Sequence, residues 1–273
     1  MGWKIRKAPG VARRLMEARA RIGEWMATVA GGMYFLDDPH PDDVHVLDVA
    51  LGLARQPRYN GQFAAHIDFY SVSEHSRLMM GYMRAHDPLE PRGGRMMLED
   101  CLKVLLHDVP EEMFGDMITM LKARFTSWRG FEDMHHDVRF RAFVPEPGAV
   151  RIGKRDIKEI DVRIRADERR VLITEPAYTA GGRETLPWLD GEVEPLGVAL
   201  ETNLPPVEAR AFLETLCRLV ETVPARDPRN APVEGHPLRR HYEDACAFLD
   251  RVPAPAPRLP ESEAEDDMEM EPS

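Results

Sequence analysis

The stretch Val104–Lys122, VLLHDVPEEMFGDMITMLK, decides the interpretation of this chain. Its first three residues are apolar and lead directly into His107 and Asp108. An uninterrupted apolar run is usually buried, so an imidazole and a carboxylate at its end carry either a large desolvation penalty or a bound cation. A metal ion removes that penalty, because both groups bind it in their deprotonated forms. The stretch therefore predicts a metal site beside a buried helix.

The His-Asp dipeptide occurs three times, so the dipeptide alone does not define a site. His86–Asp87 precedes a proline and a loop rich in Gly and Pro, which indicates a helix end near solvent. His136–Asp137 lies in a polar run without an apolar lead-in. His107–Asp108 follows the predicted buried helix and has a carboxylate, Glu111, close behind it. At about 3.6 residues per turn, Glu111 returns to the face of the imidazole if the helix continues through Pro110.

A second histidine, His75, is predicted to face inward. Ser71–Glu74 has the S-x-x-E pattern of a capping box, which begins a helix with Leu78 and Met79 on its apolar face. His75 precedes these residues by three and four positions, so it shares their face. A lone inward histidine is more often a hydrogen-bonded core residue than a metal ligand. His75 becomes a ligand candidate because His107 is a second inward histidine.

The helix predicted at Lys154–Ile173 contains Asp161 within its apolar stripe, four residues after Ile157 and three before Ile164. A carboxylate on a core face is costly unless it is paired or bound to a metal. For Asp161 alone, a buried salt bridge to an arginine is the simpler explanation. Together with the two inward histidines and the aspartate described above, it is the candidate fourth ligand. Two imidazoles and two carboxylates suit one divalent ion, with Mn²⁺, Co²⁺, Fe²⁺, Ni²⁺ or Zn²⁺ favoured over Mg²⁺.

The loop Pro57–Gly61, PRYNG, carries an arginine next to an aromatic residue. If this loop folds beside the metal region, Arg58 can bind a phosphate and Tyr59 can stack on a base. The alternative is an exposed arginine and a packed tyrosine. The residues leave both interpretations open.

The hydrophobic period predicts an all-α fold with no credible strand and no internal repeat. A first amphipathic helix is expected within Val11–Val29, ended by Gly31–Gly32. Asp42 or Asp43 is expected to cap the next helix, which runs to about Ala54. Further helices are expected to begin at Ser71 and to span Met96–Leu106, Ser127–Phe143, Lys154–Ile173, Val207–Val220 and Tyr242–Leu249, with a long loop at Tyr178–Pro205.

The 273 residues, 43% hydrophobic and 30% charged, are enough for one large domain. We expect residues 1–40 to form a helix and a turn-rich lead-in, and residues 41–250 to form the domain. Arg251–Ser273 holds seven acids and two arginines, which is −5 of the net charge of −11 and leaves −6 for the rest. This tail, residues 251–273, is Pro-rich and acidic and is expected to be disordered. The mildly acidic body argues against a stable nucleic-acid partner.

Two features of composition concern the cellular compartment. No apolar run approaches the length of a membrane span, and the basic N-terminus lacks the apolar core of a signal peptide. Cys101, Cys217 and Cys246 are far apart in sequence, each in a helical pattern, which suits reduced core thiols rather than a disulfide framework. We therefore expect a cytoplasmic protein without a membrane partner.

The order His75, His107–Asp108 and Asp161 resembles the HD superfamily of metal-dependent phosphohydrolases. The closer resemblance is to the bacterial 5′-deoxynucleotidase branch, and it covers roughly Val44–Leu172, the motif core. It implies an HD-domain helical bundle with the metal site in its core, and a possible homodimer. In that branch the first ligand lies in a segment like Tyr70–Ser76, and the His-Asp pair is followed by residues like Glu111, Gly115–Asp116 and Lys122.

The resemblance also implies a reaction, the hydrolysis of (deoxy)nucleoside 5′-monophosphates to nucleoside and phosphate. Glu111 would orient the attacking water or handle its proton. Asp116 would protonate the leaving oxygen or hold the sugar hydroxyl. Lys122 and Arg58 would neutralise phosphate oxygens, and Tyr59 would contact the nucleotide.

Other functions stay open at this stage. Glu111–Glu112 also resembles the pair that follows His-Asp in enzymes that hydrolyse the alarmone guanosine tetraphosphate. A (deoxy)nucleoside triphosphate triphosphohydrolase would use the same metal ligands. The chain could instead be a nucleotide-binding protein with an inactive HD site, although the complete ligand set and Glu111 argue against this.

Overall fold

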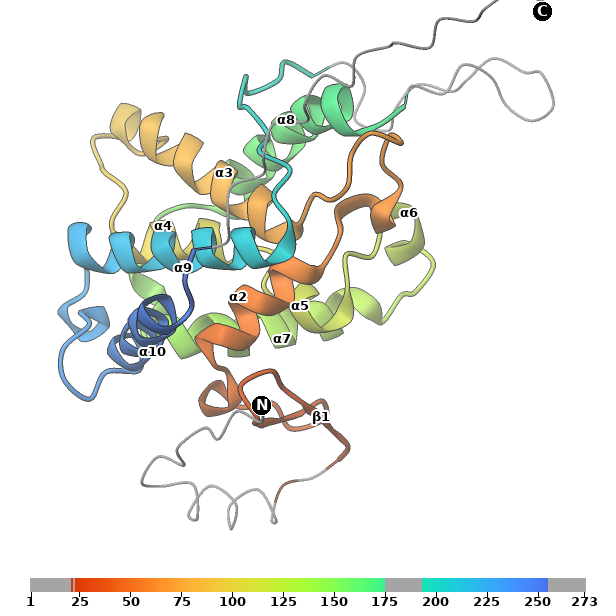
Figure 1. The fold of residues 1–273 in the computed structure, drawn as a ribbon. Helices are drawn as coiled ribbons and strands as arrows, with labels where there is room; N and C mark the ends of the chain where they lie inside the picture. Colours follow the sequence, from red (N-terminus) through yellow and green to blue (C-terminus); the bar gives the residue numbers. More distant parts are fainter. Residues whose placement is uncertain (1–20, 22, 175–192, 255–273) are drawn as a thin grey trace, which may run out of the picture.

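The computed structural model describes residue 21, residues 23–174 and residues 193–254. This part of the chain is mostly helical, as the hydrophobic period predicts (Figure 1). The helices are α2 (Val46–Arg55), α3 (Val72–Ala85), α4 (Leu98–Leu105), α5 (Glu111–Phe114), α6 (Thr119–Lys122), α7 (Trp128–Phe143), α8 (Lys154–Leu172), α9 (Pro205–Thr222) and α10 (Pro237–Arg251). Short 3₁₀ helices lie at η1 (Pro41–Asp43), η2 (Arg58–Gly61), η3 (Glu90–Arg92), η4 (Pro147–Ala149) and η5 (Pro228–Asn230).

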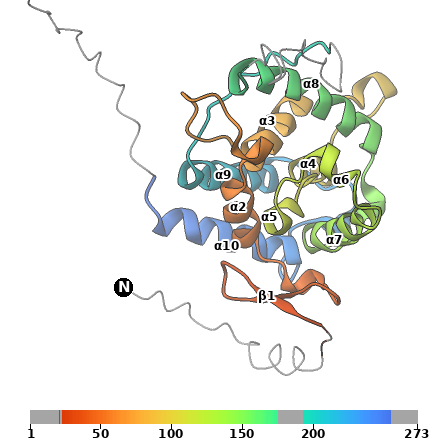
Figure 2. The same ribbon diagram turned by 90° about the vertical axis from the view of Figure 1, so that its right-hand side faces the viewer.

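Helix α4 lies in the middle of the helical body, and the prediction of a buried helix there is confirmed (Figures 1 and 2). All its residues are buried except Lys103, which is half-buried. Helix α9 packs against α2, α3, α4 and α10, while α3 packs against α2, α4 and α8. Burying one large aliphatic side chain contributes about 1.5–3 kcal/mol relative to its exposure. This packing fixes the start of α3 and the end of α4, where the candidate ligands lie.

The described part of the N-terminal segment is a β-hairpin, so the helix predicted at Val11–Val29 is wrong for these residues. Strand β1 (Trp25–Ala27) pairs antiparallel with β2 (Met33–Phe35). The hairpin and α8 lie at opposite ends of the molecule in both views (Figures 1 and 2). Residues 11–20 and 22, also part of that predicted helix, lie outside the described residues.

The hairpin turn explains why the helix prediction failed. Gly31 has a φ of 80°, and its N–H donates to the carbonyl of Thr28 over 3.0 Å. Thr28 N–H in turn donates to the carbonyl of Gly32 over 3.1 Å. Gly31 therefore adopts a left-handed conformation in the turn of a hairpin, rather than ending a helix. The fold is mostly helical with one small sheet in the described part.

Two helix starts also differ from the prediction. His45 caps α2, because its ring Nδ1 accepts from the N–H of Leu47 over 3.1 Å. Asp43, one of the two expected caps, instead accepts from Arg21 over 2.7 and 2.9 Å. A histidine in the neutral form can accept at one ring nitrogen, so it satisfies a helix N-terminus as an aspartate would.

The start of α3 has half of the predicted capping box. Ser71 Oγ accepts from the N–H of Glu74 over 3.1 Å, which confirms the N-cap. The Glu74 carboxylate does not turn back to Ser71, because it accepts from the N–H groups of Glu201, Thr202 and Asn203 over 2.7 to 2.9 Å. The segment before α9 is thereby attached to the first turn of α3.

The start of α4 is anchored by two buried carboxylates. Asp100 accepts from the N–H groups of Arg151 and Ile152 over 2.6 and 3.0 Å, and it pairs with Arg226 at 2.7 Å. Glu99 accepts from the N–H groups of Arg226 and Asp227 over 2.9 and 2.8 Å. Acids at a helix N-terminus also interact favourably with the helix dipole. These bonds attach two distant loops to the helix that leads to the candidate site.

We expect Asp100→Asn to lower the free energy of unfolding by about 1–3 kcal/mol, because a buried charged hydrogen bond to Arg226 is lost. Urea unfolding followed by circular dichroism measures this. Glu243→Gln removes an exposed partner of Arg239 and serves as the control with little expected change. Equal stability of the Asp100 variant and the wild type would contradict the anchoring role.

The remaining predictions about organisation have mixed outcomes. The segment 193–204 is non-helical, as expected of the long loop, while residues 175–192 lie outside the described residues. Helix α10 continues through Arg251, and residues 255–273 of the predicted disordered tail lie outside the description. The division into 1–40, 41–250 and 251–273 stays a prediction. Cys217 and Cys246, though distant in sequence, have their Sγ atoms 3.7 Å apart as free thiols. Among the described helices, none is both long and apolar enough to cross a membrane.

Candidate metal centre

Three helices bring the predicted ligands together. Helix α3 carries His75 in its first turn, and α8 carries Asp161. The turn directly after α4 carries His107 and Asp108. That turn is closed by the N–H of His107, which donates to the carbonyl of Val104 over 3.3 Å. The apolar run of α4 thus ends where the two ligand-type residues begin, as the sequence predicts.

His75, His107 and Asp108 form a compact cluster that could hold a metal ion. One ligand atom of each lies within 4.8 Å of the others. Asp108 Oδ2 is 3.1 Å from His107 Nε2 and 3.9 Å from His75 Nε2. The His75 side chain is fully buried, and 9% of the His107 side chain is exposed.

The hydrogen-bond acceptor at Nδ1 of each imidazole determines which ring nitrogen carries the proton. His75 Nδ1 lies 2.6 Å from Glu168 Oε1, and His107 Nδ1 lies 2.9 Å from the carbonyl of Val104. An ionised carboxylate and a carbonyl only accept, so each Nδ1 carries a proton. Both Nε2 atoms are buried and have no hydrogen-bond partner among the described residues. A polar atom left in that state costs about 1–3 kcal/mol, which a bond to a cation would remove. The donor set therefore fits a divalent metal held by two imidazoles and a carboxylate.

Asp161 reaches the cluster through His75 alone. Its Oδ1 lies 3.5 Å from His75 Nε2, while its Oδ2 accepts from Lys158 Nζ over 2.8 Å and is 3.8 Å from Arg165. The structure thus places the fourth predicted ligand beside the three-residue cluster, with its second oxygen engaged by cations. For Oδ2, the simpler explanation of Asp161 as a salt-bridge partner therefore applies.

The charged groups of the cluster shift one another's pKa values. Burial would raise the pKa of Asp108, but His107, Arg58 and His75 outweigh it and hold the pKa well below its ordinary value. Burial and Arg58 lower the pKa of His75, yet the carboxylates of Glu168 and Asp161 raise it to about 9. A proton on His75 is what a metal ion would displace, since ligands bind metals in their deprotonated forms.

Glu111 faces this cluster from a new helix rather than from a continuation of α4. Glu111 is the first residue of α5, and it is 4% exposed. Burial, then the negative charges of Asp108 and Asp116, raise the pKa of Glu111 well above its ordinary value. Its Oε1 accepts from Lys122 Nζ over 3.2 Å, and its Oε2 is buried without a hydrogen-bond partner in the part of the chain that is described. A buried carboxyl group with a raised pKa holds a proton more readily than an exposed one, which suits it to proton transfer within the site.

The loop of η2 lies against the cluster, so the alternative of an exposed arginine is wrong. Arg58 is 6% exposed, and its guanidinium is 3.6 Å from Asp108, 3.5 Å from Asp116 and 3.6 Å from Glu168. Asp116 also accepts from the N–H of Tyr59 over 3.3 Å. The candidate phosphate-binding arginine and the candidate metal ligand Asp108 are therefore direct neighbours.

The same loop has an unusual backbone. Tyr59 and Asn60 have φ values of 53° and 52°, the left-handed region that L-residues rarely adopt. Each such residue costs about 1–2 kcal/mol. The loop is held by Arg58 N–H, which donates to the carbonyl of Tyr70 over 3.0 Å, and by the contacts of Tyr59 to Asp116 and Glu168.

Two carboxylates of the site were missed by sequence reasoning. Glu132 on α7 accepts from Lys122 Nζ over 2.7 Å, so Lys122 lies between two acids. Glu168 on α8 is fully buried and contacts His75, and burial is outweighed by His75 and Arg58, which lower its pKa to about 2. Glu168 follows Asp161 by seven residues, two helical turns, and this spacing could have indicated a shared face.

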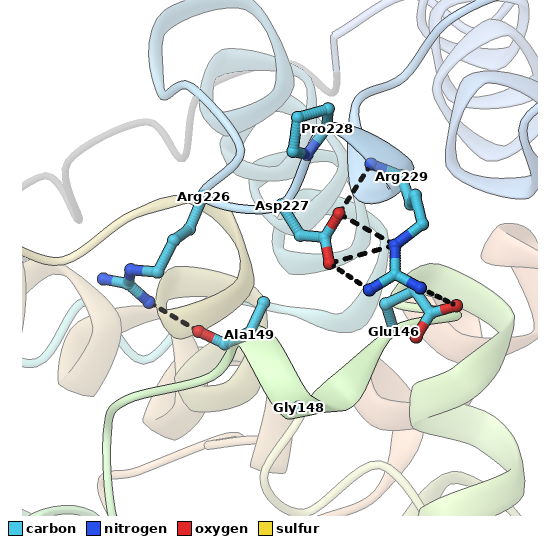
Figure 3. Close-up of a pocket in the computed structure, with 7 residues that line it drawn as sticks. All are labelled: Glu146, Gly148, Ala149, Arg226, Asp227, Pro228 and Arg229. Carbon is cyan, nitrogen blue, oxygen red and sulfur yellow. Dashed lines mark hydrogen bonds and ion pairs between the residues drawn. The ribbon is translucent and has the colours of Figure 1, made fainter.

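A separate surface pocket is lined by Glu146, Gly148, Ala149, Arg226, Asp227, Pro228 and Arg229, and by none of the cluster residues (Figure 3). Its two arginines are engaged. Arg229 contacts Asp227 and Glu146 at 2.7 and 3.2 Å, and Arg226 donates to the carbonyl of Ala149 over 2.7 Å. Both arginines of this pocket are therefore already engaged by groups of the chain.

Comparisons with known proteins give a partial likeness. No family model matches the chain. A stretch of 100 residues, 36% of this chain, is 40% identical to a protein of Rhodobacter capsulatus that is described as uncharacterized. The matched stretch spans 47% of that protein, so the chain covers less than half of its length.

Proposed function

We propose that this chain is a metal-dependent phosphohydrolase that resembles the HD superfamily and hydrolyses (deoxy)nucleoside 5′-monophosphates. One observation carries the proposal. The buried Nε2 atoms of His75 and His107 face Asp108 and have no hydrogen-bond partner within the described residues, while each Nδ1 is held by an acceptor. Imidazoles arranged in this way are prepared for a cation rather than for packing. A divalent metal, when bound, supplies Lewis acidity and lowers the pKa of a bound water.

Glu111 supplies the proton chemistry in this proposal. Its buried carboxyl group lies close enough to Asp108 for that charge to raise its pKa. Glu111 would orient the attacking water and take its proton, and Asp116 would hold the sugar or protonate the leaving oxygen. Lys122 holds Glu111 in place through its 3.2 Å contact, and Glu132 holds Lys122.

In this proposal Arg58 is the cation that would bind the phosphate. It is buried between Asp108 and Asp116, and its Nε has no hydrogen-bond partner among the residues that the structure describes. An arginine so placed can pair with phosphate oxygens through its planar guanidinium. Tyr59, whose ring lies 5.7 Å from that guanidinium, would contact the sugar or base.

The distribution of arginines favours a monophosphate. A triphosphate carries about four negative charges and calls for more cations than a monophosphate with about two. Arg77 is bound to Glu208 and Glu201, and Arg163 donates to the carbonyls of Glu194 and Pro195. Arg165 lies beside Asp161. Arg77 and Arg163 are thus engaged by other groups of the chain.

Phosphate release from a nucleotide panel tests the proposal. Protein stripped with a chelator and reloaded with Mn²⁺, Co²⁺, Ni²⁺ or Zn²⁺ is expected to release inorganic phosphate from dAMP or dGMP. A Glu111→Gln protein purified in parallel identifies any contaminating phosphatase, because a contaminant would survive in that preparation.

The alternatives are separate outcomes of the same panel. Intact triphosphate released from dATP or dGTP, with monophosphates untouched, would replace the proposal with a triphosphohydrolase. Pyrophosphate released from guanosine tetraphosphate would indicate an alarmone hydrolase. Nucleotide binding without turnover under every metal would indicate a binding protein with an inactive site.

A further inference from the structure

A buried carboxylate that the proposed chemistry does not use lies directly behind the cluster. Glu168 is 0% exposed and accepts three hydrogen bonds. Its Oε1 accepts from His75 Nδ1 over 2.6 Å and from the Tyr70 hydroxyl over 3.0 Å. Its Oε2 accepts from the Tyr59 hydroxyl over 2.6 Å and lies 3.6 Å from Arg58. The two oxygens therefore serve two different parts of the site.

We propose that Glu168 is a positioning residue that sets the metal-facing orientation of His75 and the conformation of the Arg58–Tyr59 loop at once. The metal-facing part of this proposal, which concerns His75, is argued from the geometry of the cluster. The loop-facing part, which concerns Arg58 and Tyr59, rests on the proposed function. A carboxylate behind a ligating imidazole holds the proton on the far nitrogen and raises the basicity of the near one. Fully buried carboxylates are costly, and four polar contacts, from Arg58, Tyr59, Tyr70 and His75, offset that cost here.

The metal-facing part follows from the ring of His75. With Nδ1 protonated and bound to Glu168, Nε2 is the nitrogen that faces Asp108 and Asp161, and it is the one that gives up its proton to a metal ion. Without the carboxylate, the ring can rotate or exchange its proton between nitrogens, and a fraction of molecules would present the wrong atom. Metal affinity should fall for two reasons: fewer molecules present the correct nitrogen, and that nitrogen is less basic.

The loop-facing part follows from the backbone of Tyr59 and Asn60. Two successive left-handed residues relax to an ordinary conformation unless tertiary contacts hold them. The Tyr59 hydroxyl bond to Glu168 is the shortest side-chain contact of that loop, and Asp116 adds a bond to the Tyr59 N–H. Since Arg58 precedes Tyr59, the position of its guanidinium depends on the same contact. One side chain thus connects occupancy of the metal site with the geometry of the phosphate-binding arginine.

Glu168→Gln tests the proposal, because it keeps the shape and removes the charge. We expect metal affinity, measured by chelator competition with Co²⁺ and Zn²⁺, to fall roughly 10- to 100-fold. The ¹⁵N signals of the His75 ring should show a mixture of tautomers instead of one. Asp167→Asn is the matched control, since the neighbouring Asp167 is also buried on α8 but accepts from the N–H groups of Leu196 and Gly197. That control should keep the affinity and the His75 signals of the wild type.

Tyr59→Phe isolates the loop and keeps the proposal testable if the Glu168 variant fails to fold. It should leave metal affinity unchanged and raise KM for a nucleoside monophosphate several-fold, with a smaller change in kcat. Wild-type metal affinity and a single His75 tautomer in Glu168→Gln would overturn the metal-facing part. An unchanged KM in Tyr59→Phe would overturn the loop-facing part. If the wild type releases no phosphate but Glu168→Gln still weakens metal binding, the proposed function fails and the metal-facing part stands.

Discussion

Glu111→Gln is expected to lower turnover by roughly 10²–10⁴-fold, the usual effect of losing a general acid–base group, while metal content stays unchanged. The substitution keeps the shape and an acceptor for Lys122, which contacts Glu111 Oε1 at 3.2 Å. It removes the ability of Oε2 to take a proton in its buried position. Steady-state phosphate release and elemental analysis of the same preparation measure both quantities.

The next residue provides the matched control for Glu111. Glu112 lies on the same short helix, but its carboxylate accepts from Arg139 Nε over 3.0 Å in a separate buried pair. Glu112→Gln should therefore retain turnover near that of the wild type. Normal turnover in Glu111→Gln, with turnover lost in Asp116→Asn, would transfer the proton-handling role to Asp116.

Asp108→Ala should abolish stoichiometric metal binding. Asp108 is the carboxylate of the three-residue cluster, and its Oδ2 lies within 3.9 Å of both imidazole Nε2 atoms. Its removal takes away the carboxylate nearest to both imidazoles and leaves them beside Arg58, whose charge then opposes a cation. Elemental analysis after chelation and reloading with one divalent metal should give about one ion per wild-type chain and close to none in the variant.

The His-Asp pair of α7, His136–Asp137, is the control for this experiment. Asp137 has the same sequence context of a preceding histidine, but 56% of its side chain is exposed, and it pairs with Arg141 one turn away. Asp137→Ala should bind as much metal as the wild type. Equal metal content in the wild type and Asp108→Ala would end the metal assignment.

The helical elements could be predicted because their apolar residues recur with the helical period. Met96–Leu106 and Lys154–Ile173 were expected as helices, and α4 and α8 occupy nearly those bounds. The inward position of His75 follows from the Ser71 cap, which sets the face of the first turn. The hairpin could not be predicted in this way, because a Gly-Gly pair ends a helix and turns a hairpin equally well.

Many partners within the site lie far apart in sequence, so local patterns do not predict them. The spacing of Glu168 from Asp161 indicates a shared helical face, but its hydrogen bonds come from Tyr59 and Tyr70 about a hundred residues earlier. Lys122 was expected to meet phosphate, but its position between Glu111 and Glu132 arises from the turn between α6 and α7. The residue types predicted which side chains are candidates for the site, and tertiary packing determined which side chains contact one another.

Helix α4 is anchored at its start and is followed at its end by candidate ligands. This arrangement has a consequence for folding kinetics. His75 and Asp161 are 86 residues apart in sequence, and the carboxylates that fix α4 bind residues beyond position 150 and beyond position 225. Contacts of such sequence separation form only after large loops have closed, which is entropically costly. We therefore expect the ligands to meet late on the folding pathway. A cation that binds only the assembled cluster is then expected to slow unfolding more than it speeds folding.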